Sequence, residues 1–574
     1  MQQQAQDPVG THPRAEAPRR TRVADAIAGV LKEAGVRVVF GIPGGTISPV
    51  NDALLDHPEV EVFVTRHESE AVFAACGHAN STGGVGVVFV TSGPGLTNAI
   101  TGITSAKCDA VPLLVLAGEV PRPLQGKGAL QDGSTHHLNM LNVVKSLAKD
   151  VFELAEPKTA ALRIQDALRT ARQGVPGPVV VTLPLDVLMA EAPPVVSSFA
   201  AASASFTLDA GVLDAVHGRL IDDPRPLLFA GSGLRRGDGP EKLRAFAERY
   251  QLPVVTSPKA KGVFPEDHPL SLGVFGIGGH PSALRYVSEG VSTLLAVGTS
   301  LGDLATEGWN PALKPARCLI HVDLEPSVIG RNYPADIGVV APAAAFFDAM
   351  STRPAPASRR LSFGVETHSD PEVEREGTEG RIAPSRAVYE LQRALPADAR
   401  FFIDSGEHFL FAAHYLKLSR PDQFTAMTGL GSMGSSIGLA IGAKLADPQR
   451  ASCVIIGDGG FTMIGMEVLD AVARGLPIVV AVMNDARLGM CALGHDAVYG
   501  RVPGMEVPSV DMPAFAASLG AEGYTVTRAG EIEALSDKLQ DPKRPILLDV
   551  RIDRSVKLPK RDRIGALGQG SRKC

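Results

Sequence analysis

The sequence predicts an α/β protein with three domains, each built on a parallel sheet that carries helices on both faces. Short apolar runs alternate with helical stretches, and this pattern is typical of βαβ units. This alternation occurs in three separate blocks. The chain has 574 residues, which is more than one hydrophobic core usually organises. Apolar residues make up 45% of it and glycines number 60, as buried strands with tight turns require.

The first two blocks are bounded by polar or small-residue segments. Residues 1–20 are expected to be a disordered arm, and the first domain is expected to span 21–195. Its strands are the runs VRVVFGI, VGVVFVTS, AVPLLVLAG and GPVVVTLP. A connector, SSFAAASASF, leads to a central domain over 206–350, with strands at RPLLFAG, LPVVTS, TLLAVG and CLIHVD.

The third block follows a polar segment rich in Pro, Ser and Glu, which we expect to be a linker over 352–381. The third domain is expected over 383–555, with strands at FFIDSG, CVIIGDG, IVVAVMND and ILLDVRI. The tail, 556–574, is basic and would be either a solvated chain end or a lid.

Composition excludes several classes of protein. The net charge of −6 is small for this length, so no general field would recruit nucleic acid or a membrane surface. The six cysteines form no C-x-x-C pair, which favours reduced thiols over a disulfide or zinc framework. No apolar run reaches the length of a membrane span, and the first twenty residues lack a signal-peptide core. We therefore expect a cytoplasmic protein.

The third block contains the most specific motif. Gly457-Asp458-Gly459 ends one buried strand, and a helix expected from Met463 to Arg474 leads to the next strand, which ends in Asn484-Asp485. Asp458 and Asp485 thus lie at the carboxyl ends of successive parallel strands, where open α/β sheets bind ligands. Two such oxygen ligands suit Mg²⁺ completed by phosphate oxygens. Gly-Asp-Gly alone would be a common turn, so the spacing carries the hypothesis.

Two further segments contain candidate residues. Upstream of the Gly-Asp-Gly turn, Met433 stands among glycines, as either a ligand-facing side chain or the packing residue of a helix start. In the first block, Glu68 opens a helix of small apolar residues, expected at Ala71–Ala79. A carboxyl there could exchange a proton with a ring nitrogen, or it could simply stabilise the helix N-terminus.

Together these motifs resemble the acetolactate synthase/pyruvate oxidase branch of the thiamine-diphosphate (ThDP) enzymes. The resemblance is close at FGIPGG, RHESEA, VTSGPGLTN, SSIGLAIGA, GDGGF and LGM, and it extends from about Thr21 to Asp553. It implies a pyrimidine-binding domain, a central domain and a diphosphate-binding domain. It also implies a homodimer or homotetramer in which each active site is shared between the first domain of one subunit and the third domain of another.

The resemblance also assigns roles to particular residues. Glu68 matches the glutamate that bonds the aminopyrimidine ring, Met433 the residue that bends the cofactor, and Gln131 a glutamine that acts on substrate. Gly45 falls beside the thiazolium ring. Asp458, Asp485 and the backbone carbonyl of Arg487 match the Mg²⁺ ligands. The cofactor-binding positions it implies are Ser405, Gly406, Glu407, His408, Gly431, Ser432, Met433, Gly457, Asp458, Gly459, Gly460, Asp485, Leu488, Gly489 and Met490.

The chain departs from acetolactate synthases at positions that bear on the metal and on a flavin. The second metal position is usually Asn, and Asp485 adds a negative charge. A flavin-holding R-F-D-D-R segment is replaced by the stretch 297–303, VGTSLGD, which has no arginine. We therefore expect no FAD. The turn Gly231-Ser232-Gly233 leaves open an ADP-like nucleotide, although a plain tight turn is the simpler interpretation.

Other departures lie on the expected substrate side. Gly494 replaces a tryptophan that shapes the acceptor pocket after the Leu488-Gly489-Met490 motif. His136 and His137 stand near Gln131, where acetolactate synthases have no histidine pair. They would be either polar loop residues or groups that contact substrate. With Met490, these positions are the candidates for substrate contact.

Three functions follow from these observations. The first is a ThDP- and Mg²⁺-dependent carboligase, which decarboxylates a 2-oxo acid and joins the remaining fragment to a second aldehyde or ketone. The alternative is a ThDP-dependent lyase or decarboxylase that acts on a 2-hydroxyacyl-CoA or a 2-oxo acid other than pyruvate. A non-catalytic nucleotide-binding homologue is the least supported, because Glu68, Met433 and Asp458 are all present.

Overall fold

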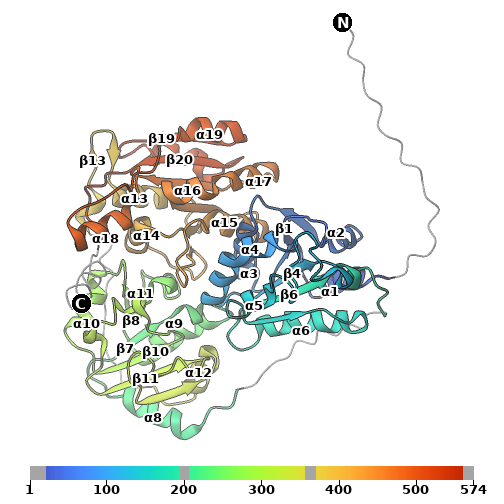
Figure 1. Cartoon of the computed structure of the whole chain (residues 1–574). Helices are drawn as coiled ribbons and strands as arrows, with labels where there is room; N and C mark the ends of the chain where they lie inside the picture. The colour runs from blue at the N-terminus through green and yellow to red at the C-terminus, as the bar shows by residue number, and fades with distance from the viewer. Residues whose placement is uncertain (1–20, 194–205, 356–369, 560–574) are drawn as a thin grey trace.

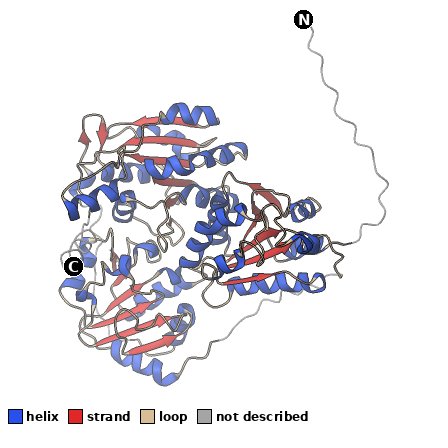
Figure 2. Ribbon diagram, in the orientation of Figure 1, coloured by secondary structure: helices blue, strands red, loops and turns tan. Residues whose placement is uncertain are grey.

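The computed structural model describes residues 21–193, 206–355 and 370–559. These residues form three six-stranded sheets in which every pairing is parallel, with helices on both faces (Figures 1 and 2). The predicted fold class is confirmed. The arm 1–20, most of the connector near 197–206 and most of the basic tail lie outside the described residues, so the predictions for them stay predictions.

The first domain has the strand order β2-β1-β3-β4-β6-β5. The four inner strands, β1, β3, β4 and β6, are fully buried apolar runs, which explains why they could be predicted from the sequence, while the edge strands β2 and β5 are more exposed. The strands are β1 Val38–Gly41, β2 Glu61–Val64, β3 Gly86–Val90, β4 Leu113–Glu119, β5 Asp150–Glu153 and β6 Pro178–Pro184. The helices are α1 Val23–Glu33, α2 Ser48–Leu54, α3 Glu68–Thr82, α4 Pro94–Cys108, α5 Met140–Lys145, α6 Ala160–Arg172 and α7 Leu185–Leu188.

The central domain has the order β12-β11-β10-β7-β8-β9, with the reversal between β7 and β10. Its strands are β7 Leu227–Ala230, β8 Val254–Thr256, β9 Ser271–Val274, β10 Thr293–Val297, β11 Cys318–Asp323 and β12 Ile337–Val340. Its helices are α8 Ala210–Leu220, α9 Gly239–Tyr250, α10 Pro281–Ser288, α11 Asp303–Thr306 and α12 Ala343–Ser351.

The third domain repeats the topology of the first, in the order β16-β15-β17-β18-β20-β19. Its strands are β15 Arg400–Ile403, β16 Phe424–Thr425, β17 Ser452–Gly457, β18 Val479–Asn484, β19 Glu522–Val526 and β20 Ile546–Arg551. Its helices are α13 Pro384–Ala394, α14 Glu407–Tyr415, α15 Ser436–Ala446, α16 Asp458–Ile464, α17 Val468–Ala473, α18 Gly489–Tyr499, α19 Met512–Leu519 and α20 Ser536–Gln540. The strand order reverses between β15 and β17, which is where such sheets bind ligands.

Several element boundaries differ from the predictions. The helix expected from Met463 begins at Asp458 instead, and a 3₁₀ turn separates it from α17. Helix α3 begins at Glu68 rather than Ala71, so Glu68 and its buried neighbours lie in the first turn. Part of the segment expected as a linker forms a small antiparallel hairpin of β13 (Gly377–Thr378) and β14 (Arg381–Ile382), and this hairpin bridges to Ile552 after β20.

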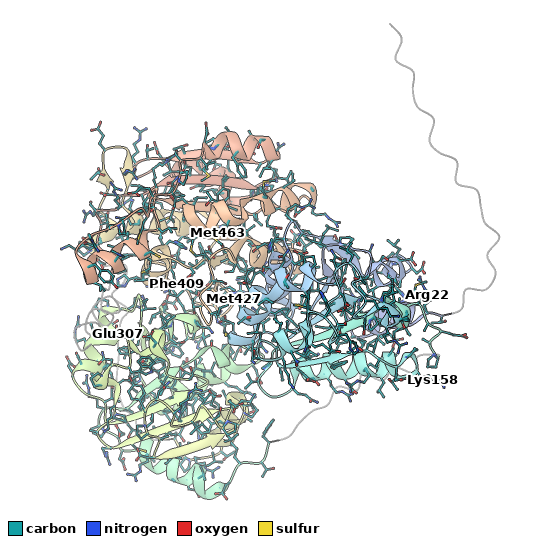
Figure 3. The ribbon with its side chains drawn as sticks, in the orientation of Figure 1. Arg22, Lys158, Glu307, Phe409, Met427 and Met463 are labelled. Atoms are coloured by element: carbon teal, nitrogen blue, oxygen red, sulfur yellow. The ribbon has the colours of Figure 1, made fainter. Side chains whose placement is uncertain are left out.

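Helices α3 and α15 join the first domain to the third. A Cβ at Gly77 would lie 2.0 Å from the Leu439 carbonyl oxygen, and one at Gly442 would lie 1.8 Å from that of Ala74. Only glycine permits this approach of the two backbones. Met427 belongs to the apolar core that the two domains share, and Figure 3 shows it on the side of the third domain that faces the other two.

The central domain is tied to the third domain by buried polar groups. Lys261 Nζ pairs with Glu266 at 2.6 Å, and both side chains are almost fully buried. Glu266 also accepts a hydrogen bond from the Leu418 backbone amide at 2.8 Å. No helix within 21–193, 206–355 or 370–559 is long and apolar enough to cross a membrane.

Candidate active site

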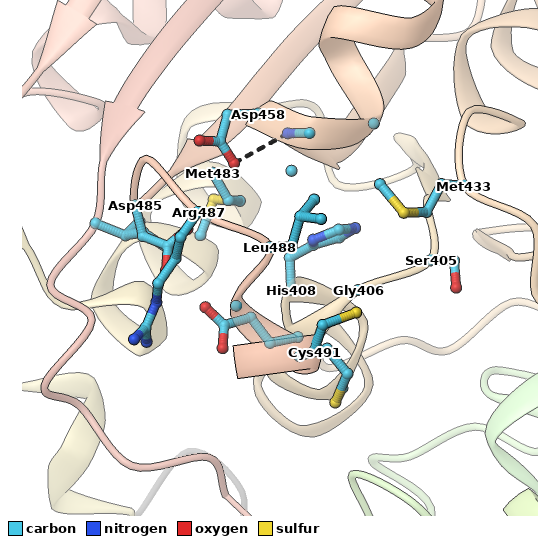
Figure 4. Close-up of a pocket in the computed structure, with 17 residues that line it drawn as sticks. Ser405, Gly406, His408, Met433, Asp458, Met483, Asp485, Arg487, Leu488 and Cys491 are labelled. Atoms are coloured by element: carbon cyan, nitrogen blue, oxygen red, sulfur yellow. Dashed lines mark hydrogen bonds and ion pairs between the residues drawn. The ribbon is translucent and has the colours of Figure 1, made fainter. Parts of the chain in front are cut away.

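Three loops meet at the carboxyl edge of the third sheet. The loop after β15 leads into α14, the end of β17 leads directly into α16, and β18 ends at Asn484 and continues to Asp485. These three strands are neighbours in the sheet. Their loops therefore surround the point where the strand order reverses, and Figure 4 shows the residues that these loops bring together.

An open cavity of about 450 Å³ lies among these loops. Its wall contains every predicted cofactor or metal position of the third domain except Gly431 and Ser432. Met483, Cys491 and Ile552 also line it and were not predicted. Met483 precedes the Asn484-Asp485 pair and Ile552 follows the last strand, so their positions could have been inferred from the strand ends. The lining residues are Ser405, Gly406, Glu407, His408, Met433, Gly457, Asp458, Gly459, Gly460, Met483, Asp485, Arg487, Leu488, Gly489, Met490, Cys491 and Ile552.

Asp458 is the best candidate for a cation ligand. Its side chain is buried, and Oδ1 accepts a hydrogen bond from the Gly459 amide at 3.0 Å. Oδ2 is buried and has no hydrogen-bond partner among the described residues. Burial and the neighbouring Asp485 raise the pKa of Asp458 to about 6. An unpaired buried carboxylate oxygen is costly, and a bound cation would relieve that cost.

Glu407 and His408 lie in the first turn of α14. Burial and the charge of Asp485 raise the pKa of Glu407 to about 7. Burial lowers the pKa of His408 to about 4, so its ring is neutral at pH 7. The Nε2 atom of His408 is buried without a hydrogen-bond partner in the described part of the chain. It can therefore donate to or accept from a ligand in the cavity.

The cavity wall is shaped by glycines at close approaches. A Cβ at Gly460 would lie 2.4 Å from Asp404 Oδ2, and one at Gly489 would lie 2.5 Å from Glu407 Oε1. Asp404 in turn accepts hydrogen bonds from the Gly434 and Ser435 amides at 2.9 and 3.0 Å. These hydrogen bonds fix the loop next to Met433. The first turn of α16 contains the backbone amides of Gly459 and Gly460. The unpaired amides of a helix N-terminus suit a phosphate group, although the Gly459 amide already donates to Asp458 Oδ1.

Met433 projects over one side of the cavity. Its Cε lies 3.4 Å from the position that a Cβ on Gly459 would take, and Leu488 Cδ2 lies 2.6 Å from that same position. Figure 4 shows Met433 across the cavity from Asp458 and Asp485, with Leu488 between them, so these two side chains make part of the cavity apolar. A ligand with a charged end and an apolar end would match this arrangement.

No cation site is complete within the described residues. Among residues 21–193, 206–355 and 370–559, no group of three or more His, Cys, Asp or Glu side chains is placed to hold a metal ion. A cation at Asp458 would therefore need oxygen ligands from the backbone, from water or from a bound phosphate.

Glu68 and its neighbours form a second polar group, at the carboxyl edge of the first sheet. Asn98 Nδ2 donates to Glu68 Oε2 at 3.0 Å, and Glu68 is buried. Gln131 lies beside Gly93, where an added Cβ would be 3.1 Å from the Gln131 Cβ, and Gln131 has a left-handed backbone with φ 62°. Gly45 is exposed on the loop after β1. The sheet topology thus brings the predicted residues of this domain to one edge.

The loop that carries Gln131 is braced by two acids. Glu119 Oε1 accepts hydrogen bonds from the Val120 and Gly133 amides, and burial raises the pKa of this carboxyl. Asp132 accepts from the Gly126 and Ser134 amides at 2.7 and 3.1 Å. These contacts explain how a non-glycine residue is held in a left-handed conformation.

The candidate substrate residues are accessible. His136 and His137 are exposed on the braced loop, and His137 Nδ1 lies 3.0 Å from the Asp132 carbonyl oxygen. Met490 lines the cavity. Gly494 lies within α18, and a Cβ there would meet nothing within 4 Å. A larger residue would therefore fit at Gly494 within one chain.

The Glu68 group does not reach the cavity of its own chain. All residues that line the cavity belong to the third domain. Gly431 and Ser432, the two predicted residues outside the wall, lie on a loop that docks instead on α4. Ser432 Oγ lies 3.2 Å from Ser105 Oγ, near the carboxyl end of that helix. Asn98, the partner of Glu68, lies about two turns away toward the other end.

In the central sheet, the glycine turn after β7 packs directly against the loop after β10, at the point where the strand order reverses. A Cβ at Gly231 would lie 2.0 Å from the Gly298 carbonyl oxygen. The Gly231 amide donates to Val297 and the Gly233 amide donates to Gly298, at 2.9 and 3.0 Å. These amides are already paired with protein carbonyls, so this turn offers neither of them to a phosphate.

Three family models match the chain in the order of its three sheets. The N-terminal TPP-binding domain of thiamine pyrophosphate enzymes matches residues 21–140, the central domain matches 213–350, and the C-terminal TPP-binding domain matches 404–550. Thiamine pyrophosphate is another name for ThDP. The chain belongs to the thiamine pyrophosphate enzymes. The resemblance read from the motifs is thereby confirmed, and so is its enzymatic class.

Curated relatives match along nearly the whole chain. A probable acetolactate synthase large subunit of Methanocaldococcus jannaschii is 32% identical over 93% of this chain and 93% of its own. The acetolactate synthase large subunit of Corynebacterium glutamicum is 32% identical over 94% of this chain and 88% of its own. The acetolactate synthase isozyme 3 large subunit of Escherichia coli is 31% identical over 93% of this chain and 95% of its own.

Proposed function

We propose that this enzyme binds ThDP and Mg²⁺ in the third-domain cavity and uses them to decarboxylate a 2-oxo acid and join the product to a second carbonyl compound. The unpaired, buried Oδ2 of Asp458 carries the proposal, because it needs a cation and faces a cavity with phosphate-binding features. Asp458, Asp485 and the backbone carbonyl of Arg487 would hold Mg²⁺. When bound, ThDP supplies a means of stabilising negative charge on the carbon next to a carbonyl.

Other residues of the cavity would orient the cofactor. The glycines that follow β15 and β17 and the first-turn amides of α14 and α16 would face the diphosphate. Gly431 and Ser432 would support the loop that presents Met433, and Met433 with Leu488 would pack against the apolar part of the cofactor. Glu68 would hold or move a proton at the aminopyrimidine ring.

Glu68 would act on the cofactor of a second subunit. The cavity of one chain is lined only by the third domain, so the first-domain group must come from elsewhere to complete a site. Exposed apolar side chains support an assembly. They lie on the segment around Gln131 in the first domain and on segments that contribute to the cavity wall or adjoin it in sequence in the third, at Leu124, Leu130, Leu138, Val143, Leu430, Met463, Met466 and Leu488. Figure 3 shows Met463 at the third domain. We propose a homodimer or homotetramer with shared active sites.

The substrate would contact residues of both the first and the third domain. Gln131 and Gly45 would lie next to the reacting carbon, and His136 and His137 would approach from the braced loop. Met490 and Gly494 would border the acceptor, and the open space at Gly494 favours an acceptor bulkier than pyruvate. We propose no FAD, because the central switch point has its Gly231 and Gly233 amides paired with protein carbonyls. A cytoplasmic site of action agrees with the five free cysteines among the described residues.

Product analysis separates this reaction from the alternative. The purified enzyme is incubated with pyruvate alone, and then with an added aldehyde or second 2-oxo acid. A carboligase forms a longer hydroxy-ketone product, while a lyase or simple decarboxylase releases only an aldehyde or a cleaved fragment. Release of acetaldehyde alone under all these conditions would replace carboligation with the alternative.

A further inference from the structure

One ion pair in the cavity is not explained by the roles assigned above. Arg487 Nε donates to Asp485 Oδ2 at 2.7 Å. The Asp485 side chain is 4% exposed and that of Arg487 is 18% exposed, so solvent screens the pair poorly. Arg487 was expected to contribute only its backbone carbonyl, yet its side chain lies beside the expected metal ligand in Figure 4.

The cavity is rich in negative charge for a site that binds a diphosphate. Three carboxylates line it, from Glu407, Asp458 and Asp485, and Arg487 supplies the single guanidinium of its wall. His408 adds no charge at pH 7. A diphosphate is itself an anion, so each uncompensated carboxylate beside it opposes its binding.

The three carboxyl groups and the guanidinium of Arg487 lie in the wall of one cavity. Without Arg487, no cationic side chain of that wall would offset the carboxyl groups.

We propose that Arg487 is the counter-charge of Asp485, so that the ion pair replaces the neutral amide usual at this metal position. The inference rests on the proposed ThDP and Mg²⁺ site. Asp485 keeps an oxygen for the cation, while Arg487 cancels the charge that would otherwise repel the diphosphate. Arg487 is thus a positioning residue that acts through Asp485, and it would have no such role beside an asparagine.

A double-mutant cycle tests this dependence. ThDP is titrated calorimetrically, at saturating Mg²⁺, into the full-length enzyme and into Arg487→Met, Asp485→Asn and the double variant. Arg487→Met should weaken ThDP binding about ten- to a hundredfold, the value of a lost charge-assisted contact. In the Asp485→Asn background the same change should alter affinity by less than about threefold. Arg487→Lys, which keeps the charge, should bind within about threefold of the parent.

A second ion pair supplies a matched control. Arg551 and Asp549 have the same spacing, with Nε–Oδ2 at 2.8 Å, and neither lines the cavity. Arg551→Met should leave ThDP affinity unchanged, whatever its effect on the melting temperature.

Two outcomes would overturn the counter-charge role. The first is that Arg487→Met weakens ThDP binding equally in the parent enzyme and in the Asp485→Asn background. The second is that Arg487→Met does not weaken ThDP binding in the parent enzyme. Failure of the parent enzyme to bind ThDP would instead refute the proposed function itself.

Discussion

Asn98, in the second turn of α4, donates a hydrogen bond over 3.0 Å to Oε2 of Glu68, the first residue of α3. This hydrogen bond from the Asn98 side-chain amide fixes the direction of the Glu68 carboxyl group, and Oε1 takes no part in it. Glu68 is therefore held in one orientation at the edge of the sheet, although the cavity of its own chain is lined by third-domain residues alone.

Replacement of Glu68 by glutamine should remove most activity while leaving ThDP bound. An amide cannot exchange a proton with the cofactor ring, so the rate should fall by roughly 10²–10⁴-fold, the range of a positioned acid–base group. Steady-state rates and calorimetry measure the two effects separately. Asn98→Ala should cause a smaller loss of rate, because it removes only the restraint. Full activity of Glu68→Gln would refute the role.

Because the site is proposed to be shared, two inactive variants should complement each other. Glu68→Gln mixed with Asp458→Ala can form hybrid dimers with one site that carries both native halves. Partial activity should return after the subunits exchange. Each variant incubated alone is the control, and a mixture that exchanges subunits yet stays inactive would contradict sharing.

Asp458→Ala should abolish retention of ThDP with little change in the fold. The substitution removes the buried oxygen that has no protein partner, so it relieves a desolvation cost while deleting the cation ligand. Retention is measured as the amount of ThDP that co-elutes with the protein in gel filtration. Asp541→Ala is the control, since Asp541 is exposed and pairs with Lys543 only on the surface. Normal retention in Asp458→Ala would remove Asp458 from the metal site.

The apolar surface near Gln131 should lie in a subunit interface. Leu130 is 87% exposed in the single chain, and a charge there would be buried on assembly. Leu130→Asp should therefore shift the enzyme toward monomers in light scattering and reduce activity with it. Leu55→Asp is a matched control, because Leu55 is 73% exposed directly after the short helix α2 of the same domain. An active parent monomer would contradict the shared site.

Stability should fall as pH rises, because of a buried acid between the first and third domains. Glu467 accepts a hydrogen bond from the Arg66 amide at 3.1 Å, and burial followed by the charge of Asp470 raises its pKa to about 8. An acid with a raised pKa in the folded state contributes stability below its unfolded pKa. That contribution is lost as pH rises through the folded value.

The melting temperature of the parent should thus decrease between about pH 5 and pH 8. Glu467→Gln should flatten this decrease, since an amide does not ionise. Glu33→Gln, at an exposed position of α1, should not change the slope. A slope unaffected by Glu467→Gln would show that other groups govern the pH dependence.

The sequence predicted the inner strands of the three sheets because those strands are apolar and buried, while short or polar edge strands such as β5, β16 and β19 were not predicted. It also predicted most of the cavity wall, since Asp458 and Asp485 follow strands whose ends must meet. The start of α16 at Asp458 was missed, because Gly-Asp-Gly is more typical of a turn than of a helix. The hairpin of β13 and β14 was missed as well, because its polar composition matches a linker.

Other features depend on contacts that sequence reading cannot supply. The packing of α3 on α15 requires Gly77 and Gly442 to face the partner backbone, and these residues are far apart in the chain. The Arg487–Asp485 ion pair depends on a loop conformation in which the side chain of Arg487 turns back toward Asp485. Residue spacing predicted Asp485 as a metal ligand, but it did not predict the ion pair between Asp485 and Arg487.

A calorimetric titration of ThDP into the full-length enzyme tests the central claim most directly. It is run once with excess Mg²⁺ and once with a chelator. The account predicts about one ThDP bound per chain with Mg²⁺ and a large loss of affinity without it, because the cation joins the diphosphate to Asp458 and Asp485. ThDP binding of equal strength in the chelator, or no binding with Mg²⁺ present, would contradict it.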